Sequence, residues 1–313
     1  MSELRFDGRV AVITGAGRGL GRAHALLLAS RGAKIVVNDL GVGLKGDSAT
    51  ADAGPAQEVV AEIKAAGGDA VANTDSVTTP EGGQAIIDTA LKHYGRIDIL
   101  IHNAGNVRRG PIKELSYEDF ELVLDVHLRG GFHVVRAAFP HMAAAKYGRI
   151  VLTSSINGLY GNPNVVNYSV AKAGLIGLSN VAAIEGAAEG IKSNVIIPAA
   201  VTRMAEGLDT SQYPPMDPEL VAPAVAWLAH ESCSITGEQL ISVAGRVARA
   251  FAAETEGLYR SSWSIEDIAA NIEAIRDTSK QWLFAPAPSG HIDHLRRSFA
   301  MAAESATQEA AKI

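Results

Sequence analysis

The chain has 313 residues, of which 47% are apolar and 20% charged, as in ordinary globular proteins. Its net charge of -6 gives no electrostatic reason to expect nucleic acid or an anionic membrane as a partner. The single cysteine, Cys233, excludes an internal disulfide and a cysteine-based metal cluster, so we expect no bound metal.

The sequence also bears on location. No apolar run approaches the roughly 20 residues that span a bilayer, and the first residues lack the apolar core of a signal peptide. We therefore expect a cytoplasmic protein that does not contact membranes. The C-terminal Ala-Lys-Ile loosely resembles a peroxisomal Ser-Lys-Leu signal, so a peroxisomal location is the alternative.

The first forty residues have the pattern of a strand, a glycine-rich turn, a helix and a second strand. The turn, Gly15-Ala-Gly-Arg-Gly-Leu-Gly21, lies between an apolar strand at residues 9–14 and a helical pattern at residues 22–31. Such a turn lets the backbone approach a pyrophosphate, whose charge the helix N-terminus stabilises. In this context the turn predicts dinucleotide binding. The expected contacts come from Gly15, Arg18, Gly19, Leu20 and Gly21.

Asp39 closes the second strand, at residues 34–39. A carboxylate there accepts hydrogen bonds from the adenosine ribose hydroxyls and repels a 2′-phosphate, so NAD is favoured over NADP. Arg18 favours the alternative, because an arginine in this turn could reach a 2′-phosphate.

Strands continue to alternate with helices along the chain. Strands are expected over residues 69–75, 97–103, 149–153, 193–198 and 240–245, and helices over residues 56–66, 80–94 and 117–145. This order predicts an α/β fold with a Rossmann-type, doubly wound parallel sheet. Ligands bind such sheets at the carboxyl ends of the strands. The residues expected at those ends are Gly15, Asp39, Asp75, Asn103, Ser155 and Pro198, with Ser76, Ala104 and Gly105 directly after two of them.

Three side chains suggest a chemistry. Ser155 follows the strand at residues 149–153, and Tyr168 and Lys172 lie four residues apart on the next predicted helix, so they share one face. An ammonium beside a tyrosine lowers the phenol pKa from its usual value of about 10, and the tyrosine can then exchange a proton with a carbinol or carbonyl. A serine hydroxyl can hold the same oxygen. A Tyr and a Lys on one exposed helix face are also common without any function.

Together these motifs resemble the short-chain dehydrogenase/reductase family. The resemblance rests on Thr14-Gly-Ala-Gly-Arg-Gly-Leu-Gly21, Asn103-Ala-Gly105, Ser155 and Tyr168-Ser-Val-Ala-Lys172, and covers about residues 6–245. It implies that Tyr168 is the acid/base and that Ser155 holds the substrate oxygen. It also implies that Lys172 lowers the Tyr168 pKa and binds the nicotinamide ribose, and that residues 103–105 line the cofactor site.

Further segments resemble a narrower branch of that family, the (3R)-hydroxyacyl-CoA dehydrogenase domains of peroxisomal multifunctional enzymes. These segments include Val37-Asn-Asp-Leu-Gly41 and Val126-His-Leu-Arg-Gly130. The resemblance implies an NAD-dependent alcohol dehydrogenase whose substrate is a 3-hydroxyacyl-CoA. A 17β-hydroxysteroid or another bulky secondary alcohol is the alternative substrate. A non-catalytic NAD-binding regulator is the competing class, although Tyr168 and Lys172 are both present.

The sequence departs from the family pattern at three places. Most of the family has asparagine where His127 stands, and His127 either replaces it in the proton relay or is a buried, hydrogen-bonded histidine. The usual Pro-Gly is Pro198-Ala199 here, with Thr202 nearby to contact the cofactor. Residues 205–218, the substrate lid of the family, have no close match among the narrower relatives.

We expect a dehydrogenase domain at residues 1–245 and a helical extension at residues 246–313. Residues 246–251 are predicted to be helical, and Ser264 to cap an amphipathic helix with Asp267 three residues on. The extension either packs against a subunit or sheet edge, or covers the substrate cleft. The apolar faces of the helices near His127 and after Tyr168 predict a homodimer or homotetramer.

Overall fold

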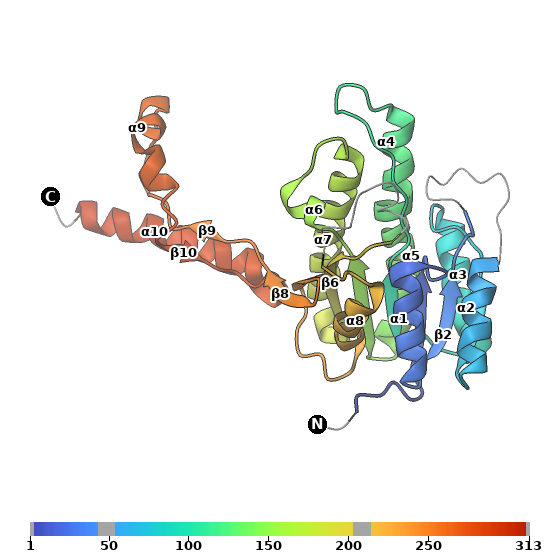
Figure 1. Cartoon of the computed structure of the whole chain (residues 1–313). Coiled ribbons are helices and arrows are strands. Elements are labelled where there is room, and N and C mark those ends of the chain that lie inside the picture. The colour runs from blue at the N-terminus through green and yellow to red at the C-terminus, as the bar shows by residue number, and fades with distance from the viewer. Residues whose placement is uncertain (1–2, 43–53, 203–213, 311–313) are drawn as a thin grey trace. The chain divides into compact units, whose positions relative to one another are not determined.

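The protein is described here from a computed structural model, in which residues 3–42, 54–202 and 214–310 are described. An eight-stranded sheet has the strand order β3-β2-β1-β4-β5-β6-β7-β8 (Figure 1). All the pairs from β3 to β7 are parallel. The strands are β1 (Val10–Thr14), β2 (Lys34–Asn38), β3 (Asp69–Asn73), β4 (Ile99–His102), β5 (Gly148–Thr153), β6 (Ile191–Ala199), β7 (Gln239–Val243) and β8 (Arg246–Ala250). The predicted parallel α/β sheet is therefore confirmed.

Helices cover both faces of this sheet. The helices are α1 (Gly19–Ser30), α2 (Gly54–Ala65), α3 (Pro80–Tyr94), α4 (Tyr117–Leu124), α5 (Gly130–Ala144), α6 (Ile156–Tyr160), α7 (Val166–Gly186) and α8 (Ala222–Ala229). Helix α1 packs against α2 and α8 on one face, while α5 packs against α3 and α7 on the other. This is the doubly wound arrangement, which leaves the carboxyl ends of the strands open to a ligand.

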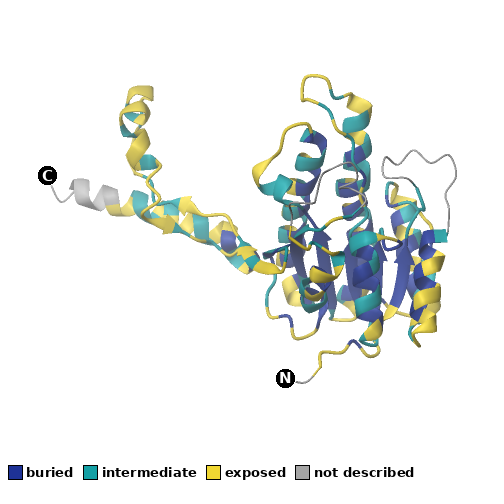
Figure 2. Cartoon of the chain, viewed as in Figure 1, coloured by how far each residue is buried: buried dark blue, intermediate teal, exposed yellow. Residues whose placement is uncertain are grey.

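The central strands lie in the core of the molecule (Figure 2). Every residue of β1, β4 and β5 is buried, as continuous apolar strands covered on both faces require. Because these three strands are adjacent, the polar residues that follow them are held on a rigid base.

The secondary structure differs from the sequence prediction in two regions. The helix expected over residues 117–145 is interrupted by a π-helical turn at Asp125–Arg129, which contains His127. The sequence predicts a helical segment at residues 246–251, but residues 246–250 form the strand β8. Ala244 and Gly245 have φ angles of 49° and 79°, the backbone of a two-residue hairpin turn that brings β8 back along β7. The conformation of this turn, and not the local helical pattern, determines that residues 246–250 form a strand.

The chain divides into two compact units, Met1–Arg249 and Ala250–Ile313. The second contains the short strand pair β9 (Glu254–Thr255) and β10 (Gln281–Trp282), together with α9 (Ile265–Ile275) and α10 (His291–Ala310). Ser264 Oγ accepts a hydrogen bond from Asp267 N at 3.0 Å and Asp267 Oδ2 accepts one from Ser264 N at 3.1 Å, so the expected cap is present. Within the described ranges, no helix is long and apolar enough to cross a membrane.

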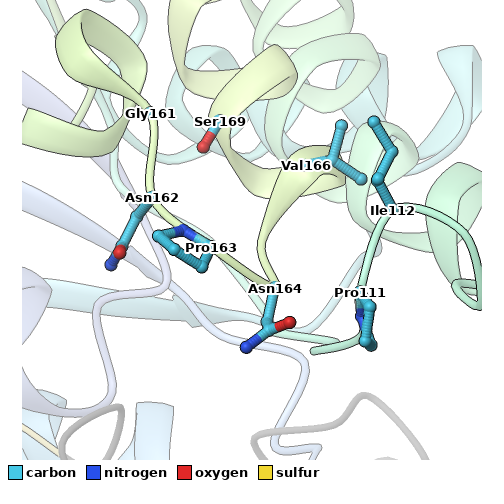
Figure 3. A pocket seen from close by; sticks show the side chains of 8 residues that line it. All are labelled: Pro111, Ile112, Gly161, Asn162, Pro163, Asn164, Val166 and Ser169. Carbon is cyan, nitrogen blue, oxygen red and sulfur yellow. The ribbon is translucent and has the colours of Figure 1, made fainter.

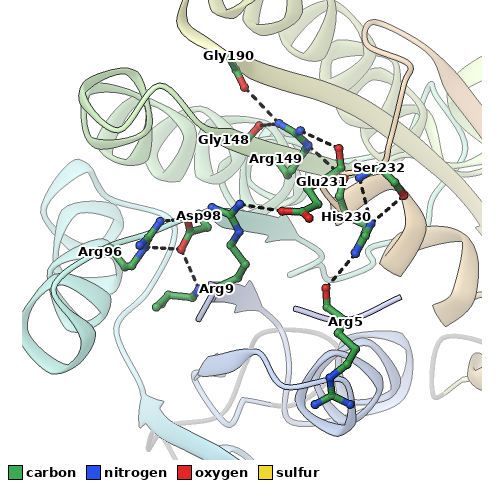
Figure 4. A network of polar contacts seen from close by, with 11 residues as sticks. Arg5, Arg9, Arg96, Asp98, Gly148, Arg149, Gly190, His230, Glu231 and Ser232 are labelled. Atoms are coloured by element: carbon green, nitrogen blue, oxygen red, sulfur yellow. Dashed lines mark hydrogen bonds and ion pairs between the residues drawn. The ribbon is translucent and has the colours of Figure 1, made fainter. Parts of the chain in front are cut away.

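A buried carboxylate joins the start of the sheet to a neighbouring loop. The fully buried Asp98 accepts hydrogen bonds from Val10 N at 2.9 Å, Arg9 Nη1 at 3.1 Å and Arg96 Nη2 at 2.6 Å (Figure 4). A buried charge is tolerated only when it is paired and hydrogen-bonded in this way. Asp98 therefore fixes β1 against the segment that leads into β4.

We expect Asp98→Ala to lower the free energy of unfolding by about 3 kcal/mol, because Val10 N and two guanidinium groups lose their acceptor. Urea denaturation measures the change. The control is Glu62→Ala, which breaks the exposed pair with Arg22 at 2.7 Å and should change stability by less than about 0.5 kcal/mol. Equal effects of the two substitutions would contradict a structural role for Asp98.

Candidate active site

A cleft of about 710 Å³ lies at the carboxyl ends of the parallel strands. It is lined by sixteen of the residues selected from the sequence: Gly15, Arg18, Gly19, Leu20, Asp39, Asp75, Ser76, Asn103, Ala104, Gly105, His127, Ser155, Tyr168, Lys172, Pro198 and Thr202. Gly21 does not line the cleft. A Cβ on Gly21 would lie 2.2 Å from Gly15 O, so this glycine allows α1 to pack closely against the turn.

The glycine-rich turn is shaped to leave its backbone accessible. Gly15 has a φ of +63°, and a Cβ there would lie 2.8 Å from Ala104 Cα. Helix α1 begins at Gly19 without a side-chain cap, because Arg18 makes no capping hydrogen bond. Its first backbone N–H groups and its dipole are therefore available to an anionic group.

Asp39 is tied to the same turn. Its two carboxylate oxygens accept hydrogen bonds from Gly17 N and Gly41 N, each at 2.9 Å. The carboxylate is thus fixed at the cleft end of β2, where Asp75 also lines the wall. Most of residues 41–55, which follow β2, and most of the predicted lid segment at residues 205–218 lie outside the described residues.

A second set of contacts joins the turn to the end of β4. Thr14 Oγ1 accepts hydrogen bonds from Asn103 N and Ala104 N, both at 3.1 Å. Asn103 Nδ2 donates to Gly15 O at 3.0 Å. The ring nitrogens of His102 lie 3.0 Å from Thr14 Oγ1 and 2.9 Å from His127 O. This network holds the glycine-rich turn, the end of β4 and the π-helical turn in fixed positions around the cleft.

Ser155, Tyr168 and Lys172 meet on another wall. Ser155 lies two residues beyond the end of β5 and caps α6, where its Oγ accepts a hydrogen bond from Asn157 N at 3.1 Å. Lys172 is buried, donates to Thr153 O at 2.5 Å, and has its Nζ 5.5 Å from the centroid of the Tyr168 ring. A hydroxyl, a phenol and an amine are thereby placed around one space.

Burial has the largest effect on the pKa values of Lys172 and Tyr168. It lowers the pKa of Lys172 from 10.5 to about 7, because the ammonium is desolvated and no carboxylate of the described residues offsets that cost. Burial also raises the pKa of Tyr168, and the hydrogen bond with Ser155 and the charge of Arg109 oppose that rise. Sequence reasoning expected Lys172 to lower the Tyr168 pKa. In the structure Lys172 Nζ donates to Thr153 O, and the groups that oppose the rise of the Tyr168 pKa are Ser155 and Arg109.

His127 lies on the π-helical turn and is buried. Its Nε2 is 2.8 Å from Asn106 O and 3.1 Å from Asn106 N, while its Nδ1 has no hydrogen-bond partner among the described residues. The ring stands edge-on to Tyr168 with the centroids 5.2 Å apart. Burial and then the charge of Lys172 lower the His127 pKa well below 6.5, so the ring is neutral at physiological pH. The π turn places this ring behind Gly105, where a Cβ would lie 2.4 Å from His127 Cε1.

The structure adds residues that sequence reasoning missed. Arg109 and Asn162 also line the cleft. Asn162 is shared with a second, shallower hollow of about 410 Å³, walled by Pro111, Ile112, Pro163 and Val166 (Figure 3). The signal for Arg109 was its place just after Asn103-Ala-Gly105, in the loop that leaves the carboxyl end of β4.

The cleft fits a nicotinamide dinucleotide. At one end Asp39 can accept ribose hydroxyls, and in the middle the uncapped start of α1 can receive a pyrophosphate. At the other end Tyr168, Lys172 and Ser155 surround the space left for a reacting carbon. The residues that would hold the cofactor are therefore the ones that line this cleft.

Comparison with known proteins gives consistent results. A family model described as short chain dehydrogenase matches residues 9–212. Peroxisomal multifunctional enzyme type 2 of Drosophila melanogaster is 52% identical over 244 residues, which are 78% of this chain and 40% of that protein. A short-chain type dehydrogenase/reductase of Mycobacterium tuberculosis is 45% identical over 273 residues, which are 87% of this chain and 95% of that protein.

A solved structure also matches. The structure of the full-length Drosophila melanogaster enzyme aligns with a TM-score of 0.80 and 39% identity, covering 96% of this chain and 50% of that chain. This chain thus spans half or less of the multifunctional enzyme.

The burial of Lys172 predicts a specific pH dependence. Between pH about 7 and 10.5 the unfolded chain keeps a proton that folded Lys172 has released, so stability attributable to this residue rises with pH in that window. Relative to Lys172→Met, we expect the unfolding free energy of the wild type to increase by up to about 1.4 kcal/mol per pH unit. Urea denaturation at a series of pH values measures this difference. A difference that is flat across the window would mean that Lys172 titrates normally.

Proposed function

The chain belongs to the short-chain dehydrogenase family, and on that premise we propose that it interconverts (3R)-hydroxyacyl-CoA and 3-ketoacyl-CoA thioesters with NAD. It is an oxidoreductase that acts on CH–OH groups with a nicotinamide cofactor. The observation that carries the proposal is the convergence of Ser155, Tyr168 and Lys172 with the glycine-rich turn in one cleft. The similarity to the Drosophila enzyme supports the acyl-CoA substrate.

In this proposal, Tyr168 exchanges the proton and Ser155 holds the oxygen. A nicotinamide cofactor held by the residues of the cleft would supply the hydride acceptor for oxidation and the hydride donor for reduction. Tyr168 takes the hydroxyl proton in oxidation and donates it to the carbonyl oxygen in reduction. Because burial raises the Tyr168 pKa, the phenol is protonated at neutral pH and suited to donation, and oxidation should speed up as the pH rises.

Lys172 and His127 have supporting roles in this mechanism. Lys172 would bind the nicotinamide ribose through the Nζ that now donates to Thr153 O. His127 would relay a proton, since its ring is neutral and its Nδ1 lacks a described partner. The alternative, a structural histidine, is supported by the contacts of Nε2 with Asn106.

NAD is proposed over NADP because of Asp39. Its carboxylate is fixed by two backbone N–H groups at the end of β2, where a 2′-phosphate would meet a negative charge. Arg18, which also lines the cleft, could offset part of this repulsion.

We also propose a homodimer or homotetramer. Exposed apolar side chains lie on the two long helices, and a second subunit would remove them from water. They are Phe132 on α5 and Val170, Val181 and Ile184 on α7.

The two-domain division at residues 245 and 246 and the cytoplasmic location stay predictions. The name of the insect relative supports the peroxisomal alternative.

Tyr168→Phe tests the proposed function. The substitution removes only the hydroxyl, so we expect kcat for 3-hydroxybutyryl-CoA to fall by roughly 100- to 10,000-fold while the Kd for NADH is unchanged. NADH absorbance and fluorescence titration measure the two quantities. Tyr160→Phe is the matched control, because Tyr160 is exposed on α6. Retained turnover in Tyr168→Phe, or activity of the wild type on hydroxysteroids but not on hydroxyacyl-CoA, would reject the proposal.

Asp39→Ala tests the coenzyme preference. Loss of the carboxylate removes an acceptor for the ribose hydroxyls and the repulsion of a 2′-phosphate, so kcat/KM should fall for NAD and rise for NADP. The ratio of the two should change by roughly 10- to 100-fold, the effect of about 1.5–3 kcal/mol for charged hydrogen bonds. An unchanged ratio would show that Asp39 does not set the preference.

A further inference from the structure

Arg109 occupies a constrained position in the loop after β4. The residue before it, Arg108, forms an ion pair with Asp119 at 3.1 Å. The residue after it, Gly110, donates its N–H to Asn164 O at 3.0 Å and forms an isolated parallel bridge with Val165. Both neighbours of Arg109 are thus anchored, one to α4 and the other to the segment that leads into α7.

This anchoring brings Arg109 to the reacting end of the cleft. Val165 directly precedes α7, which carries Tyr168 in its first turn, and Arg109 and Tyr168 line the same cleft. The charge of the Arg109 guanidinium also opposes the rise of the Tyr168 pKa. Arg18, the other arginine of the cleft, lies at the start of α1 on the dinucleotide side.

Arg109 has no ion pair or hydrogen bond with another side chain in the part of the chain that the structure describes. It is exposed, whereas the adjacent Arg108 is paired with Asp119. A guanidinium keeps its charge at every physiological pH and carries five N–H donors, which match the oxygens of an acyl or carboxylate group. The cleft that holds Tyr168 therefore also offers a cationic donor that no described side chain pairs.

We propose that Arg109 binds the acyl oxygen at C1 of a 3-hydroxyacyl substrate while Tyr168 and Ser155 hold the oxygen at C3. This role rests on the proposed function. The two carbons that carry these oxygens, C1 and C3, are separated by a single methylene carbon, so one short segment of substrate can meet both groups. A steroid or simple cyclic alcohol has no oxygen at that position, so it would gain no hydrogen bond from Arg109.

Arg109→Met tests the role because it removes the charge and the donors but keeps a long side chain. We expect kcat/KM for 3-hydroxybutyryl-CoA to fall roughly 10- to 100-fold more than kcat/KM for neutral secondary alcohols such as cyclohexanol. Arg109→Lys should recover part of the loss, and the Kd for NADH should not change. Arg136→Met, which removes an exposed charge from α5, is the control.

The outcomes separate the role of Arg109 from the proposed function. An equal loss for both classes of substrate would mean that Arg109 acts only through the pKa of Tyr168, and it would overturn the proposal, as would no loss at all. If the wild type prefers free 3-hydroxybutyrate and Arg109→Met abolishes that preference, Arg109 binds a carboxylate and the thioester assignment fails. If the wild type oxidises steroids and neither hydroxyacyl compound, both proposals fall.

Discussion

The site depends on a buried amine and a partly buried phenol, Lys172 and Tyr168, which no carboxylate among the described residues compensates. Lys172 donates to Thr153 O, and desolvation brings its pKa to about 7. The same desolvation raises the pKa of Tyr168. The free energy for this burial comes from the sheet beneath, whose strands β1, β4 and β5 are entirely inside the molecule. The lowered pKa of Lys172 and the raised pKa of Tyr168 therefore have the same main cause, which is their burial in this fold.

The network at the strand ends explains how distant segments act together. Thr14 joins the glycine-rich turn to Asn103 and Ala104, and His102 links that turn to the backbone of the π-helical segment. A dinucleotide bound on the glycine-rich turn would thus lie against residues 103 and 104. The hydrogen bonds of Thr14 and His102 fix the position of these residues and also that of the backbone of His127. Substrate selection falls instead to the loop of Arg109, which is tied to the segment before Tyr168.

Sequence reasoning recovered the features that depend on local pattern, such as the buried strands, the glycine-rich turn and the Tyr168–Lys172 spacing. It missed features that depend on contacts between distant segments. The π turn places His127 against Gly105, and the position of Arg109 is held by the hydrogen bond between Gly110 and Asn164. β8 was misassigned because the turn at Ala244 and Gly245 outweighs the local pattern. The Tyr168 pKa depends on burial, which a spacing of four residues does not reveal.

The central claim is that the buried phenol faces the carbon that exchanges hydride. A crystal structure of the chain with NADH tests it most directly. The account predicts the pyrophosphate at the N-terminus of α1 and the reactive edge of the nicotinamide ring beside the Tyr168 hydroxyl, with the Lys172 amine on the ribose. A dinucleotide bound outside this cleft, or a ring turned away from Tyr168 and Lys172, would contradict it.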